Sequence, residues 1–234
     1  MSILFEQRPS DSPFIDTVMR GRTMDEGSTI RPAEVHWHMV FTKYEGKFYP
    51  FVVGPWTTSG VVNFTEGAEV LWVRFKLGAF MPHLPTRDFL DSETVLPGAA
   101  AKDSFWLHGS AWQFADFENV ETFVDRLVRD GALVHDPLVE AALQGRPLGI
   151  PSRTIRHRFL RATGVSQIHI RQFERAQRAA TLLGQGHPII DTVYELGYFD
   201  QPHMTHALKR FIGHTPKQWI EGPPAEAVQL NTPA

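Results

Sequence analysis

Short runs of alternating apolar and polar residues fill the first half of the chain, and turn signals such as Glu45-Gly46 and Gly54-Pro55 separate them. A period of two is typical of strands that have one face in a core and one face outside it. The sequence therefore predicts a small antiparallel sandwich or barrel, with an irregular loop over Leu77–Pro85. The expected strands are Phe14–Arg20, Glu34–Thr42, Lys47–Val53, Thr57–Phe64 and Val70–Lys76.

Two of these runs predict which side chains face the core. The core face is expected to carry Val35, Trp37, Met39, Phe41, Leu71, Val73 and Phe75. The opposite face is expected to carry His36, His38, Val40, Trp72 and Arg74.

Apolar residues recur at steps of three and four in the second half, which predicts amphipathic helices. The longest runs from Gln167 to about Leu183 and leaves Arg171, Arg175 and Arg178 off its apolar face. Strands followed by helices predict an α+β chain. The expected helices are Asn119–Asp130, Asp136–Gln144, the long helix, a short helix from Ile189 to Leu196, and one from about Gln201 to Ile212.

The residues that begin and end the last helices predict a helix-turn-helix. Gly197 allows a tight turn after the short helix, and Asp200 is a good N-cap for the next one. Gly213 supplies a left-handed stop, and Thr215-Pro-Lys-Gln218 fits a capping box. A short helix, a tight turn and a polar-faced helix place that second helix in the major groove of DNA.

The run from Ile189 to Ile220 resembles the second helix-turn-helix of AraC/XylS-type bacterial transcription regulators. Its apolar helix ends in Gly-Tyr, Lys-Arg closes the recognition helix, and Gly-His-Thr-Pro follows. Pro151–Ser166 resembles the recognition helix of the first unit in that family. Only Gly145–Ile150 precedes it, so we expect a compressed first unit without a separate positioning helix. The resemblance implies tandem helix-turn-helix units and a sequence-specific regulator that binds double-stranded DNA.

The recognition helices and their flanks supply the candidate DNA contacts. Hydrogen-bonding side chains suit base edges, and cations beside them suit phosphates. Base contacts are expected from Arg153, Arg156, His157, Gln201, His203, Thr205 and His206. Phosphate contacts are expected from Arg158, Arg171, Arg175, Lys209 and Arg210.

Charged residues are distributed unequally between the β-rich first half and the helical second half of the chain. Residues 146–221 hold eleven Lys and Arg against five Asp and Glu, a net +6, and the rest carries −9, for −3 overall. A basic lobe on an acidic one is expected when only one domain meets phosphate. We therefore expect a β-rich regulatory domain at 1–131, a DNA-binding domain at 132–221, and a disordered tail at 222–234.

The N-terminal part resembles, less specifically, the small sensor-like domain that precedes this DNA-binding unit in some relatives. The segments GPWTT, VRFKLGAFMPHLP and FWLHGSAWQF carry that likeness, and a cupin-like arrangement is implied at fold level only. An effector pocket is expected between a β face and the Trp-rich segment Phe105–Trp112. Its candidate residues are His36, His38, Trp56, Trp72 and Arg74.

Two other functions stay open at this point. His36 and His38 could begin a metal site, but no third ligand is fixed by spacing, so we expect neither a metal nor another cofactor. A cupin-like metal enzyme is one alternative, although no catalytic motif is present. A ligand-binding protein with a vestigial DNA-binding domain is the other.

Zero cysteines fit a reducing compartment, and the first residues do not form a signal peptide, so a cytoplasmic location is expected. The expected partners are DNA and an unknown small effector, and no membrane. A homodimer remains an alternative to a monomer, and RNA polymerase would be a partner of an activator.

Overall fold

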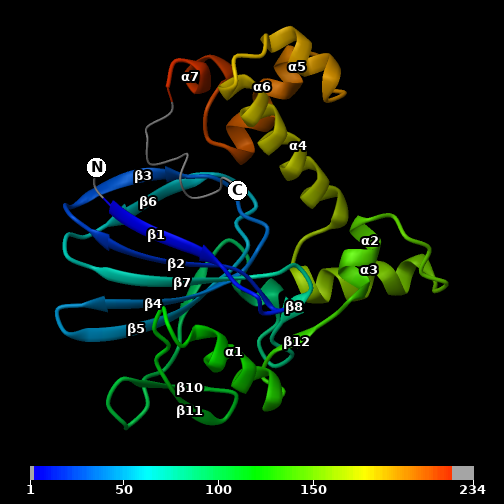
Figure 1. Cartoon of the computed structure of the whole chain (residues 1–234). Helices are drawn as coiled ribbons and strands as arrows, with labels where there is room; N and C mark the ends of the chain where they lie inside the picture. The colour runs from blue at the N-terminus through cyan, green and yellow to red at the C-terminus, as the bar shows by residue number, and fades with distance from the viewer. Residues whose placement is uncertain (1–2, 223–234) are drawn as a thin grey trace.

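The computed structural model describes residues 3–222. Its N-terminal part is built on a six-stranded antiparallel sheet in the order β1-β2-β7-β4-β5-β9 (Figure 1). The strands are β1 (Ile3–Pro9), β2 (Ile15–Thr23), β7 (Glu69–Phe75), β4 (His38–Tyr44), β5 (Lys47–Val53) and β9 (Glu93–Val95).

One face of this sheet carries the larger apolar core. Trp37 and Phe75 stack in it with ring centroids 4.0 Å apart. Helix α1 (Val120–Arg129) and the hairpin β10 (Ser104–Leu107) and β11 (Ser110–Gln113) cover that face with Phe105, Trp112 and Phe123. Every side chain that the alternation assigned to this core is buried, although Val35 joins a second core near the helices.

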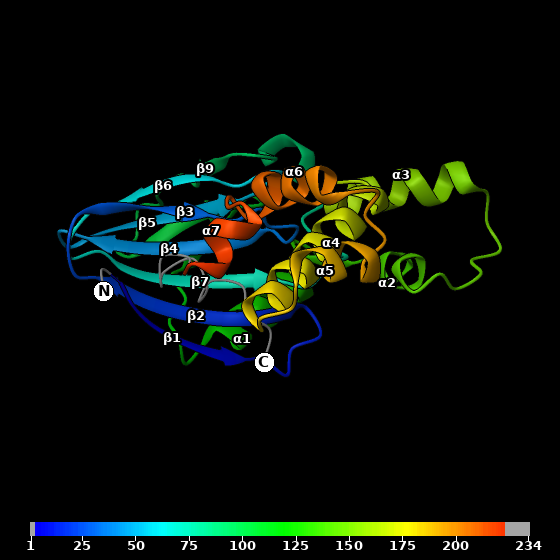
Figure 2. The same ribbon diagram turned by 90° about the horizontal axis from the view of Figure 1, so that it is seen from above.

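A two-stranded ribbon, β3 (Gly27–Arg31) and β6 (Gly60–Phe64), lies on the other side of the sheet, towards the C-terminal helices (Figures 1 and 2). The layers are therefore the ribbon, the sheet, and α1 with the hairpin. This arrangement puts β3 and β6 next to the part of the chain that resembles a DNA-binding domain.

The strand predictions hold where alternation is strong. β5 has the predicted bounds, and β2 and β7 match within a few residues. The strand expected from Glu34 begins only at His38, and the one expected from Thr57 begins only at Gly60. The prediction of a wholly irregular Leu77–Pro85 loop is wrong, because β8 (Ala79–Phe80) pairs there with β12 (Val134–His135). The remaining strands show no clear alternation and were missed.

The C-terminal part is helical, as predicted. Its helices are α2 (Leu138–Leu143), α3 (Ser152–Thr163), α4 (Gln167–Gly184), α5 (Ile189–Glu195), α6 (Gln201–Phe211) and α7 (Pro216–Ile220). They bury a second core that contains Ile170, Phe173 and Phe211 and also takes in Ala33, Val35 and Phe80 from the β-rich part. The α+β prediction is confirmed. The expected tail lies, apart from Gly222, outside the described residues. No described helix is long and apolar enough to cross a membrane.

Candidate nucleic-acid interface

Local capping sets the position of α6. The carboxylate of Asp200 accepts a hydrogen bond of 2.7 Å from the backbone N–H of His203 at the start of the helix. Gly197 adopts φ 66° in the preceding turn, a conformation that glycine reaches without steric cost. After α6, the side chain of Thr215 and that of Gln218 complete the predicted capping box. The sequence signals for this unit are confirmed.

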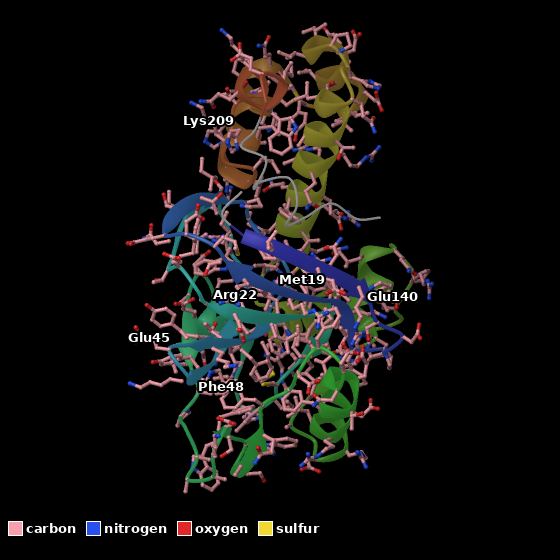
Figure 3. The ribbon with its side chains drawn as sticks, turned by 60° about the vertical axis from the view of Figure 1, so that its left-hand side comes forward. Met19, Arg22, Glu45, Phe48, Glu140 and Lys209 are labelled. Atoms are coloured by element: carbon pink, nitrogen blue, oxygen red, sulfur yellow. The ribbon has the colours of Figure 1, made fainter. Side chains whose placement is uncertain are left out.

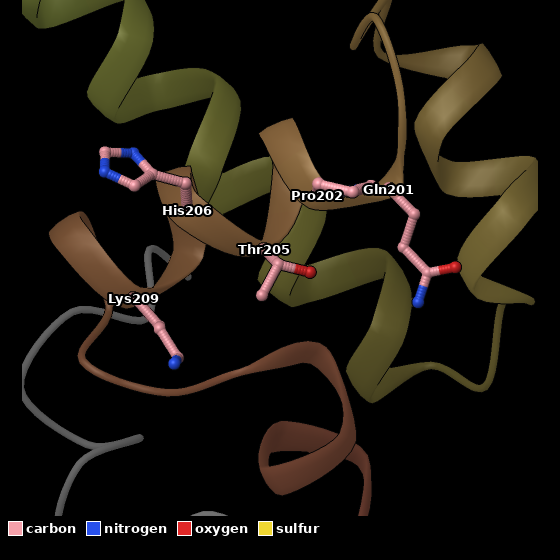
Figure 4. A pocket seen from close by; sticks show the side chains of 5 residues that line it. All are labelled: Gln201, Pro202, Thr205, His206 and Lys209. Carbon is pink, nitrogen blue, oxygen red and sulfur yellow. The ribbon is translucent and has the colours of Figure 1, made fainter.

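The buried stripe of α6 leaves a polar outer face. Met204, Leu208 and Phe211 turn inward against α4 and are at most 2% exposed. A shallow hollow runs along the opposite side and is lined by Gln201, Pro202, Thr205, His206 and Lys209. These side chains point away from α4 (Figure 4), and Lys209 lies on the outer side of the molecule (Figure 3). An amide, a hydroxyl, an imidazole and an ammonium group on one helix face can all bind base edges or phosphates.

Two of the predicted contact residues already have partners near this face. His203 accepts a hydrogen bond through Nδ1 from the backbone N–H of Phe199, at 3.3 Å, and meets Tyr198 edge to face. Arg175 places its guanidinium 4.4 Å from the centroid of the Tyr198 ring. Both side chains therefore brace the turn between α5 and α6, and their predicted DNA contacts stay predictions.

The first unit is compressed, as the sequence predicts. Residues 144–151, between α2 and α3, contain no helix. Arg153, Arg156 and His157 are exposed along α3. Arg158 instead binds both carboxylate oxygens of Asp136, at 2.9 Å and 2.6 Å, so its charge is largely met within the protein. Arg171 on α4 is exposed and has its charge available to solvent.

The N-terminal domain caps the C-terminal end of α6, which the sequence did not predict. The backbone N–H of Ala33 donates to the carbonyl of Phe211 at 2.7 Å, and that of Ser59 donates to the carbonyl of Arg210 at 2.7 Å. The hydroxyl of Ser59 donates to the carbonyl of Lys209 at 2.9 Å. These bonds satisfy carbonyls that a helix end otherwise leaves open. They join residues about 150 to 180 positions apart, so no local pattern could have announced them.

The predicted effector residues His36, His38 and Arg74 do lie together, on the sheet face opposite the core. His36 Nδ1 is 2.7 Å from Glu34 Oε1, and His38 Nε2 is 3.9 Å from Glu34 Oε2. Arg74 Nε donates to Asp16 at 2.6 Å, and its Nη1 lies 3.8 Å from Glu34. The two carboxylates compensate the charge of Arg74, so this arginine is not a free anion site.

The two predicted Trp members have other neighbours. The guanidinium of Arg31 lies over the ring of Trp56, 3.9 Å from the ring centroid, and the ring of Trp72 contacts that of Phe5. The Phe105–Trp112 segment packs in the core on the other side of the sheet from His38 and Arg74. The expectation of a pocket between that segment and the His and Arg side chains is therefore wrong, because the sheet separates them.

Burial and neighbouring charges shift the pKa values of Glu34 and His38 in this cluster. Burial alone would raise the pKa of Glu34, but His36, His38 and Arg74 around it lower the value to about 2. Burial lowers the pKa of His38 to about 4, and the positive charge of Arg74 acts in the same direction. Among residues 3–222, no group of three His, Asp or Glu side chains could hold a metal ion.

The helical part of the chain is similar to a known family of domains. A family model described as a helix-turn-helix domain matches residues 145–222. A structure of ToxT from Vibrio cholerae at 1.65 Å resolution is 10% identical, covers 94% of this chain and 98% of its own, and has a TM-score of 0.39. A second ToxT structure, from Vibrio cholerae O395 and bound to (E)-4-(8-methylnaphthalen-1-yl)but-3-enoic acid, is 9% identical, covers 94% and 99%, and has a TM-score of 0.41.

No curated protein matches the chain at a significant level. The family match begins just after α2 and includes both predicted recognition helices, α3 and α6. Residues 145–222 thus match a helix-turn-helix domain, which follows a β-rich N-terminal part.

Proposed function

We propose that this chain is a transcription regulator that binds specific DNA sequences mainly through α6. The supporting observation is that one accessible side of this helix presents Gln201, Thr205, His206 and Lys209 together. The first recognition helix, α3, adds Arg153, Arg156 and His157 as a second set of contacts. We further propose that the protein acts in the cytoplasm, where a bacterial chromosome is accessible.

Loss of one phosphate contact is the expected effect of Lys209→Ala. Each neutralised phosphate contributes about −0.9 to the slope of log affinity against log salt concentration. The variant should bind all duplexes more weakly and show a slope shallower by about 0.9. Fluorescence anisotropy with labelled genomic fragments over a series of salt concentrations measures both quantities.

Lys102→Ala serves as the matched control. It removes the same charge from an exposed loop before β10, at the end of the molecule far from α6 (Figure 1). Equal slopes for the two variants would contradict the proposed role of α6.

We also propose that the N-terminal domain transmits a small effector's signal to α6, and the caps at Ala33 and Ser59 give it a physical route. An effector can regulate only if its affinity differs between DNA-competent and incompetent states. A metabolite screen on the full chain, read by thermal shift, identifies binders by mass action. If binders raise the melting temperature but leave DNA affinity unchanged, the N-terminal domain is not the sensor.

A further inference from the structure

A second hollow lies where the N-terminal domain meets the outer face of α6. It is lined by Thr58 and Ser59 from the N-terminal domain and by His206, Lys209 and Arg210 from α6. His206 and Lys209 also line the hollow along the recognition helix. The loop that holds Thr58 therefore continues the candidate DNA surface instead of lying apart from it.

This loop, from Trp56 to Gly60, is held in place from both ends. The backbone N–H and the hydroxyl of Thr57 donate to Asp91 at 2.5 Å and 2.7 Å. Ser59 makes its two bonds to the end of α6, and Arg31 Nη1 donates to the carbonyl of Thr58 at 3.3 Å. A loop that is already ordered loses little conformational entropy when a partner binds.

Two cationic side chains line the hollow, and the carboxylate of Asp91, which binds the loop, is held by two hydrogen bonds from Thr57. Lys209 and Arg210 are exposed beside the hollow, and Arg31 lies behind the loop. Burial lowers the pKa of Arg31 to about 10, a value at which the group keeps its charge at neutral pH. The carbonyls at a helix end carry partial negative charge, and the N–H groups of Ser59 and Ala33 neutralise part of it here.

We propose that the Trp56–Gly60 loop is part of the DNA interface, and that Thr58 with Lys209 and Arg210 binds a backbone phosphate at the C-terminal end of α6. Hydroxyl and cationic side chains are the usual protein donors to phosphate oxygens. The inference rests on the proposed function and adds a DNA contact from the N-terminal domain. It implies that this domain positions the recognition helix and also contributes to affinity.

Charge substitutions at Thr58 test this directly, because its side chain is exposed and only its backbone carbonyl binds Arg31. With the full-length chain and a labelled genomic duplex, Thr58→Glu should weaken binding about tenfold or more. Thr58→Lys should tighten it several-fold and steepen the salt slope by about 0.9. Thr58→Ala should weaken it a few-fold. If Thr58→Glu fails to fold, Thr58→Lys and Thr58→Ala still give opposite predicted signs.

Thr65→Lys and Thr65→Glu are the matched controls, since Thr65 is exposed just beyond the far end of β6. Equal effects at Thr58 and Thr65 would overturn the inference. It would also be overturned if Lys and Glu at Thr58 both weaken binding while Ala tightens it, because the loop would then obstruct DNA. Lys209→Ala distinguishes failure of the loop contact from failure of the proposed function. If Lys209→Ala weakens DNA binding while the Thr58 variants leave it unchanged, only the loop contact is wrong. If Lys209→Ala also leaves DNA binding unchanged, the proposed function is wrong.

Discussion

Replacing Phe211 with alanine is expected to lower the free energy of unfolding by about 3–5 kcal/mol, the usual cost of removing a buried phenyl ring. Phe211 is 2% exposed at the end of α6. Its ring meets those of His169 and Phe173 edge to face, at centroid distances of 5.4 Å and 6.2 Å. Its carbonyl accepts the bond from Ala33, so the residue stands where the two domains join.

Chemical denaturation of the full chain measures this loss, and Lys209→Ala is the control from the exposed face of the same helix. The control should change stability by no more than about 0.5 kcal/mol. A loss below about 1 kcal/mol for Phe211→Ala would show that the ring is not packed as described.

Acidification from pH 7 to pH 4 is expected to destabilise the protein through His38. Its folded pKa, about 4, lies below the ordinary value of 6.5, so the unfolded chain binds the proton first. The contribution of His38 to the free energy of unfolding is therefore fully present above pH 6.5 and is lost as the pH falls towards 4. At about 1.4 kcal/mol per pH unit across that interval, the loss is about 3 kcal/mol. Glu34 adds to it at lower pH, because its lowered pKa makes its contribution disappear between about pH 4.5 and 2.

Unfolding free energies measured at pH 7, 6, 5 and 4 test this prediction in the intact protein and in His38→Gln. The variant should lose most of the slope between pH 6.5 and 4, although it starts from a lower stability. His157→Gln, which removes an exposed imidazole on α3, controls for histidine replacement as such. Parallel profiles for the intact protein and His38→Gln would contradict the role given to His38.

The sequence predicted what depends on neighbours along the chain. The cap at Asp200, the capping box at Thr215 and the inward stripe of α6 are local, and each is present. Alternation also placed His38 and Arg74 opposite the core. It could not show that Glu34 and Asp16 meet them, because those contacts depend on how strands and their flanks come together in space.

The candidate DNA site also has some features that the sequence predicts and others that depend on the fold. Its outer face on α6 follows from helical period alone. The bond from Ser59 to Arg210 and the ion pair of Arg158 with Asp136 need the folded arrangement of separate segments. The first contact brings the N-terminal loop beside α6, and the second pairs a predicted phosphate-binding arginine with a carboxylate of the protein itself.

We propose that α6 reads DNA sequence, and selection from a pool of randomised duplexes tests this most directly. The intact chain should enrich one preferred sequence. Gln201→Ala should lose discrimination at one or two base pairs, worth about 1–3 kcal/mol for a bidentate contact, and keep the rest of the preference. Gln113→Ala, at an exposed position of β11, should select the same sequence as the intact chain. No enrichment by the intact chain, or an unchanged preference in Gln201→Ala, would contradict the account.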